Sequence, residues 1–160
     1  MDLREIVKVV IAILICQMAG VIGSFFTADA IPGWYATLVR PEFSPPNWVF
    51  APVWLTLYTL MGISLYLVWN KSRGKKAKAA TPALLVFSAQ LVLNAIWSII
   101  FFGLQSPFYA FIIIIFLWVL IAGSIYFFYK ISKTAAYLLI PYIIWVSFAA
   151  VLNYYIWILN

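Results

Sequence analysis

The sequence contains no histidine and only one cysteine, Cys16, among its 160 residues. Without histidine, the chain lacks the most common zinc and haem ligand and the most common general base. A single cysteine cannot form a disulfide within the chain, and Cys16 lies in an apolar run where it should pack as a small hydrophobic residue. Only four carboxylates are present, none of them inside an apolar run, so a proton relay through buried acids is not expected.

Charged residues are also scarce. They make up 9% of the chain, against about 25% in an ordinary soluble domain. Hydrophobic residues make up 67%, and a globule of this size cannot hide so much apolar surface from water. The composition therefore excludes a soluble enzyme, a disordered chain and a nucleic-acid-binding domain, although the net charge is +6.

The sequence instead contains five long runs without a charged residue, at 9–28, 43–70, 79–106, 107–129 and 134–160. A helix needs about 20 apolar residues to cross a bilayer. Proline favours helix starts, so Pro45 and Pro46 place the second start near residue 47, and Pro82 marks the third. Runs such as FIIIIFLWVLIAG do not alternate as the strands of a β-barrel do. We predict a single all-α membrane domain over residues 1–160, with five spans at about 7–28, 47–70, 82–104, 107–129 and 134–158.

The five-span count assumes that the first run is kept, and its roughly 20 residues exceed the 7–15 of the apolar region in a cleaved signal peptide. With five spans, nine of the ten basic residues share one side of the membrane, and only Arg40 lies on the other. The positive-inside rule then places the N-terminus in the cytoplasm and the C-terminus on the opposite side. The basic run KSRGKKAK is most simply part of this signal, with binding of anionic lipid as a secondary role.

The segment between the first two spans reads WYATLVRPEFSPPNWVF at residues 34–50. Its prolines stiffen it and its aromatic residues give it an apolar body, so we predict a long ordered loop. Two interpretations remain open for this loop. It is either part of an aromatic belt at the level of the lipid head groups, which is the more common case, or a lid over a pocket.

Polar and aromatic residues share single faces of four predicted helices. These sets are Gln17, Gly20, Val21 and Ser24; Trp54, Tyr58 and Met61; Gln90, Asn94, Trp97 and Ser98; and Trp145, Ala149 and Asn153. Interhelical packing with side-chain hydrogen bonds would explain any one set. Together the four sets favour a shared cavity for a large, flat, mostly apolar molecule, because aromatic faces stack on planar ligands.

Three segments of these helices resemble the TspO/MBR family: WYATLVRPEFSPPNWVFAPVWLTLY, QLVLNAIWSIIFFG and PYIIWVSFAAVLN. The resemblance runs from about residue 17 to residue 157. It implies a five-helix membrane bundle, usually a homodimer, in which the loop after the first helix covers an internal pocket. It also implies a porphyrin such as protoporphyrin IX as the ligand, without a cofactor or a metal.

The resemblance implies roles for residues that the spacing also selects. Trp54 and Trp145 match two tryptophans linked to porphyrin degradation in the family, a tentative catalytic role. The positions that match the family's ligand pocket are Tyr35, Pro45, Asn94, Trp97 and Ala149, and the helix faces add Tyr58 and Gln90 as candidates. The sequence 152–160 lacks the basic residue of a cholesterol motif proposed for animal members, so strong cholesterol binding is not expected.

Three functions remain open at this point: binding of porphyrins as a receptor-like membrane protein, their degradation with light and oxygen, and transport of tetrapyrrole or sterol-type ligands. The sequence offers no acid–base or metal constellation for ordinary catalysis, so an enzymatic activity is uncertain. A transporter of the alternating-access type is disfavoured, because an odd number of spans without visible repeats does not match the repeat architecture of such proteins.

Overall fold

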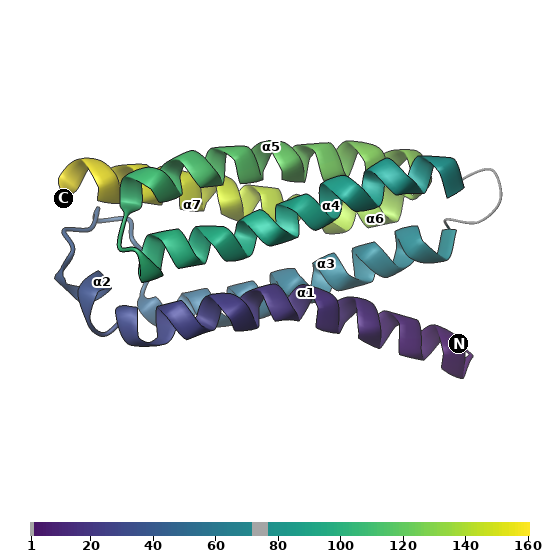
Figure 1. Cartoon of the computed structure of the whole chain (residues 1–160), viewed down its shortest axis with the longest axis horizontal. Helices are drawn as coiled ribbons and strands as arrows, with labels where there is room; N and C mark the ends of the chain where they lie inside the picture. Colours follow the sequence, from purple (N-terminus) through teal and green to yellow (C-terminus); the bar gives the residue numbers. More distant parts are fainter. Residues whose placement is uncertain (1, 72–76) are drawn as a thin grey trace.

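The computed structural model describes residues 2–71 and 77–160, and in this part of the chain all regular structure is helical (Figure 1). Five helical segments are long and apolar enough to cross a membrane, which confirms the predicted fold class. They are α1 (Leu3–Ala30), α3 (Phe50–Lys71), α4 (Ala77–Ser98) with its extension η3 (Ile99–Gly103), α5 (Pro107–Ile131), and α6 (Lys133–Leu138) followed by α7 (Ile140–Leu159). Two short helices, α2 (Trp34–Thr37) and η1 (Asn47–Val49), lie in the loop between α1 and α3.

The helices form two groups. α1 packs along α3, whereas α5 packs between α4 and α7, and the groups meet where α1 contacts α4 and where α3 contacts α6 (Figure 1). The N-terminus and the C-terminus lie at opposite ends of the bundle, and α2 lies at the same end as the C-terminus. The loop that contains α2 and η1 therefore covers one end of the bundle.

Prolines affect the helices in different ways. α3 runs without interruption through Pro52, which lies in its first turn, whereas the fifth span is divided at Leu139, just before Pro141, into α6 and α7. The third span departs from the expected start at Pro82, because α4 already begins at Ala77. Because Pro82 has no backbone N–H, it cannot donate to the carbonyl of Lys78 four residues earlier, at the start of α4.

The third span ends in a π-helical turn, η3. The N–H of Leu104 donates to the carbonyl of Ile99 at 2.9 Å, five residues earlier. Gln105 then adopts a positive φ of 51° and reverses the chain into α5. Single π-helical turns are frequent at functional sites, and this one lies next to the cavity described below.

Candidate ligand-binding site

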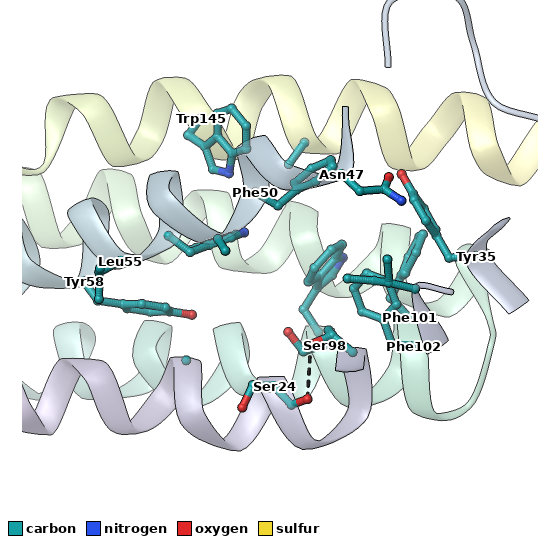
Figure 2. A pocket seen from close by; sticks show the side chains of 18 of the residues that line it. Ser24, Tyr35, Asn47, Phe50, Leu55, Tyr58, Ser98, Phe101, Phe102 and Trp145 are labelled. Atoms are coloured by element: carbon teal, nitrogen blue, oxygen red, sulfur yellow. Dashed lines mark hydrogen bonds between the residues drawn. The ribbon is translucent and has the colours of Figure 1, made fainter. Parts of the chain in front are cut away.

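A cavity of about 400 Å³ lies between α1, α3, η3 and α7, beneath the loop that covers this end of the bundle (Figure 2). Its volume falls in the range of small-molecule sites in proteins, roughly 300–1,000 Å³. Six of the nine residues proposed from the sequence line it together: Tyr35, Trp54, Tyr58, Trp97, Trp145 and Ala149.

Stacked aromatic rings form the walls of the cavity. The Trp54 and Tyr58 rings of α3 stack with their centroids 5.4 Å apart, and the Trp97 and Phe101 rings stack at 5.1 Å. On α7, the Trp145 indole packs edge-on against Phe50 at 6.0 Å. Such walls offer broad, rigid apolar faces, which suit a planar ligand.

A buried chain of hydrogen bonds holds Tyr58 in the wall. The Tyr58 hydroxyl donates to Oδ1 of Asn94, whose Nδ2 donates to the Tyr142 hydroxyl at 3.0 Å. The Tyr142 hydroxyl in turn donates to Oε1 of Gln90 at 2.9 Å. Asn94 and Gln90 therefore lie behind the wall, where they join α3, α4 and α7, and do not line the cavity.

A second set of hydrogen bonds holds Trp97. Its Nε1 donates to Oδ1 of Asn153 at 3.0 Å, and Nδ2 of Asn153 donates to the carbonyl of Pro107 at 2.8 Å. This arrangement fixes the indole of α4 against α7 and the start of α5. The amide of Asn153 thus joins α4, α5 and α7, and Asn153 also lines the cavity.

Small residues of α1 make room for the opposite wall. A Cβ atom added at Gly20 would lie 2.6 Å from Cε2 of Tyr58, so only glycine allows the tyrosine ring to lie against α1. Nearby, Nε2 of Gln17 donates to the carbonyl of Leu55 and to the Thr59 hydroxyl, both at 3.1 Å. The polar face predicted on the first helix therefore joins α1 to α3 and also contributes Gln17 and Gly20 to the cavity.

The indole N–H of Trp145 has no hydrogen-bond acceptor among the described residues, although its nitrogen is buried. Figure 2 shows this nitrogen on the side of the ring that faces the cavity. An unpaired N–H away from water carries a desolvation cost of about 1–3 kcal/mol. The Trp145 indole thus keeps an unpaired donor in the wall of the cavity, whereas the Trp97 indole donates to Asn153.

The loop supplies the end of the cavity through Tyr35 and Asn47. The guanidinium of Arg40 lies over the Tyr35 ring, 5.2 Å from its centroid, and donates from Nη1 to Oδ1 of Asn47 at 3.1 Å. Burial raises the pKa of Tyr35 above its usual value of 10.0, and the positive charge and hydrogen bonding of Arg40 oppose this rise. The loop thus contributes to the cavity as a lid would, while its Trp48 is 74% exposed, as expected of an aromatic belt.

Three of the proposed residues lie outside the cavity lining: Asn94 and Gln90, used in the buried chain, and Pro45, which borders a separate depression in the loop. The lining also includes residues that the sequence analysis did not propose as site residues, chiefly Phe50, Phe101, Phe102, Leu152 and Ile156. Helical spacing could have indicated two of them, because Phe101 and Phe102 follow Trp97 and Ser98 by four residues. Among the described residues, no three histidine, cysteine or carboxylate side chains are grouped to hold a metal ion.

Comparison with known proteins gives a consistent result over almost the whole chain. The model of the TspO/MBR family matches residues 12–158. The chain is 43% identical over 156 residues to the tryptophan-rich protein TspO of Archaeoglobus fulgidus, covering 98% of this chain and 99% of that protein. It is 40% identical over 157 residues to the protein of the same name from Chlorobaculum tepidum, covering 98% of each. It is also 40% identical over 136 residues to the translocator protein of Homo sapiens, covering 85% of this chain and 80% of that protein.

Proposed function

Because the chain belongs to the TspO/MBR family, we propose that it is a receptor-like membrane protein that binds porphyrins and other flat apolar molecules in the aromatic cavity. Protoporphyrin IX is the ligand to test first. The stacked walls offer large planar faces, and the five candidate spans suit ligands that partition into a membrane.

The observation that carries this proposal is the unpaired indole N–H of Trp145 beside the cavity. A buried donor without an acceptor is costly, and a ligand acceptor placed against it removes that cost. Two other polar groups of the cavity lining, the Tyr58 hydroxyl and the Trp97 indole, donate to Asn94 and to Asn153. Trp145 is therefore a group expected to help orient a ligand between the aromatic walls.

Binding is tested by quenching of tryptophan fluorescence as protoporphyrin IX is titrated, in the dark, into the purified protein in detergent. We expect saturable quenching, with affinity about fivefold lower in Trp145→Phe, which keeps the ring packing but loses one neutral hydrogen bond. Ala149→Phe should abolish saturation, because it fills the cavity. Trp118→Phe is the matched control, since the Trp118 indole donates to Ser147 and does not line the cavity. Linear quenching that is the same in the wild type and in all three variants would mean that porphyrin merely dissolves in the micelle.

A second candidate function is light- and oxygen-dependent degradation of the bound porphyrin. The observation that favours it is that Trp54 and Trp145 line the same cavity, where both indoles would lie beside a bound macrocycle. Under illumination in air, with ligand held at a saturating concentration, porphyrin absorbance should decay in the wild type. The double variant Trp54→Phe, Trp145→Phe should retain bound porphyrin without this decay. Decay at the wild-type rate in that variant would exclude the indoles from the reaction.

A further inference from the structure

A second, polar depression lies in the loop itself, formed by residues 38–48 around Arg40, Ser44 and Asn47. It differs in character from the aromatic cavity, because a guanidinium, a hydroxyl and an amide border it. Asn47 lines both spaces, so the depression adjoins the end of the cavity.

Arg40 is a cation without a carboxylate partner in the described part of the chain. The ion pair found there, Lys8–Glu5, lies near the N-terminus at the opposite end of the bundle, and Glu42 makes no contact within 4 Å of the Arg40 guanidinium. A guanidinium has five N–H donors in a planar fork, more than its two neighbours Asn47 and Tyr35 can accept. Donors of this group therefore remain for a ligand.

Ser44 contributes a second, independent observation. Its hydroxyl oxygen is buried and has no hydrogen-bond partner among the described residues. Ser44 borders the same depression as Arg40. A buried hydroxyl without a partner is uncommon, and a hydrogen bond to a ligand would satisfy it. The depression is therefore bordered by an exposed guanidinium that has no carboxylate partner among the described residues, and by a serine whose buried hydroxyl has no partner there either.

The loop holds this depression in a defined position. The side-chain amide of Asn160 accepts from the backbone N–H of Val39 and donates to the carbonyl of the same residue, both at 3.0 Å. It also donates to the carbonyl of Ile156 at 2.8 Å, which ties the residue before Arg40 to the end of α7. Asn47 and Tyr35, both labelled in Figure 2, line this end of the cavity, and Arg40 contacts both of them. Arg40 thus lies directly beyond two residues that line it.

We propose that the loop depression is an anion subsite, which takes the carboxylate of a ligand whose apolar body lies in the aromatic cavity. This inference rests on the proposed binding function and specifies its ligand class as flat apolar molecules with an acidic end. Arg40 would bind the carboxylate in the two-pronged geometry that guanidinium groups favour, and the Ser44 hydroxyl would donate a further hydrogen bond. Neutral ligands of the same shape would lose these contacts.

A lipid phosphate offers the same chemistry as a ligand carboxylate, because both are oxygen anions that bind arginine in a fork. The difference lies in the source. A ligand carboxylate comes attached to the molecule in the cavity, so the subsite increases the affinity of that molecule. A lipid phosphate comes from the bilayer and would compete for Arg40. The experiment therefore varies the ligand and the lipid separately.

The test compares protoporphyrin IX with its uncharged dimethyl ester by fluorescence quenching, first in an uncharged detergent. In Arg40→Gln the affinity for the diacid should fall by about tenfold, as expected for loss of a charged hydrogen-bonded pair, and the affinity for the ester should stay unchanged. Ser44→Ala should weaken diacid binding by about threefold without lowering the melting temperature, because no hydrogen bond within the protein is lost. Glu42→Gln is the matched control on the same loop and should not weaken binding of the diacid.

Different results would separate this inference from the function on which it rests. If both porphyrins bind saturably but Arg40→Gln changes their affinities equally, the subsite is refuted and the cavity stands. If neither binds saturably, the proposed function itself fails. The second arm uses nanodiscs of phosphatidylcholine with and without phosphatidylglycerol. A loss of diacid affinity with phosphatidylglycerol that disappears in Arg40→Gln would assign the subsite to lipid phosphate and overturn the carboxylate assignment; equal affinities in both membranes support it.

Discussion

Gly62, in the middle of α3, is the point at which α3 lies against the backbone of α1. A Cβ atom added there would overlap Cα of Ile13 and lie 2.8 Å from both N and Cγ1 of the same residue. Two of these three atoms belong to the backbone, so no change of rotamer can relieve the overlap. Glycine at such contacts allows the close approach of helices that is common in membrane proteins. We predict that Gly62→Ala forces α1 and α3 apart.

The size of the effect follows from the geometry. Carbon atoms in ordinary contact are about 3.5–4.0 Å apart, so α1 would have to withdraw by about 1 Å opposite Gly62. Insertion of a methyl group into a packed interface costs about 1–3 kcal/mol, a large part of the 5–15 kcal/mol by which proteins are typically stable. α1 also carries Gln17 and Gly20 of the cavity, so ligand affinity should fall together with stability.

The assay is thermal unfolding of the purified protein in one detergent at one concentration. Gly123→Ala provides a matched control, because the nearest atom to its added Cβ is a methyl group of Val86 at 3.3 Å, which can move. The double variant Ile13→Ala, Gly62→Ala removes Cγ1 but leaves Cα and N of residue 13 in place, so it should recover only a small part of the loss. Wild-type stability in Gly62→Ala, or full recovery in the double variant, would refute the backbone contact.

Three further predictions concern the cavity and its loop. Asn153→Leu should lower the free energy of unfolding by about 1–2 kcal/mol and weaken porphyrin binding, because the Trp97 indole loses its acceptor. Chemical unfolding measures the first effect and fluorescence titration the second. Wild-type values in both measurements would contradict this prediction. Burial raises the pKa of Tyr35 above 10.0, so the folded state retains a proton that the unfolded state loses, and stability should fall as the pH rises above that value. Melting temperatures measured between pH 9 and 11 should fall less in Tyr35→Phe, and an identical slope in both proteins would rule out this contribution. Asn160→Ala should release the backbone of Val39 and speed ligand dissociation in stopped-flow measurements with little change in melting temperature; an unchanged rate would mean that this contact does not restrain the loop.

Much of the fold could be predicted from the sequence because a bilayer sets the length of an apolar helix. The five charge-free runs correspond to five long helices, and the division of the last span falls next to Pro141. The start of the third helix could not be placed in the same way. Proline marks a helix start only because the first turn needs no N–H donors, and α4 accommodates Pro82 one turn later. The π-helical turn η3 has no sequence signal of comparable strength.

The candidate site was predictable where spacing alone decides which face a residue occupies. Residues four apart, such as Trp54 and Tyr58, share a face in any helix, and both line the cavity. Spacing cannot tell whether an amide on that face meets a ligand or another side chain. Asn94 and Gln90 lie on the expected face, but they form hydrogen bonds with tyrosines of α3 and α7 and do not line the cavity. Tyr142, which joins both amides, follows Pro141 and belonged to no predicted polar face.

The buried polar groups of this protein therefore fall into two classes: those that form hydrogen bonds between helices, and those that have no partner among the described residues. A polar group buried away from water has no water to bind, so nearly every such group must find a partner inside the protein. Three buried side-chain atoms of the described residues do not: Nε1 of Trp145, Oγ of Ser44 and Nε2 of Gln90. The Gln90 atom borders neither pocket, whereas Trp145 borders the cavity and Ser44 the depression next to it. If the proposed function holds, a molecule that accepts from the indole at one end and carries an oxygen anion at the other would satisfy both, so we expect an acidic planar ligand to bind more tightly than a purely apolar one.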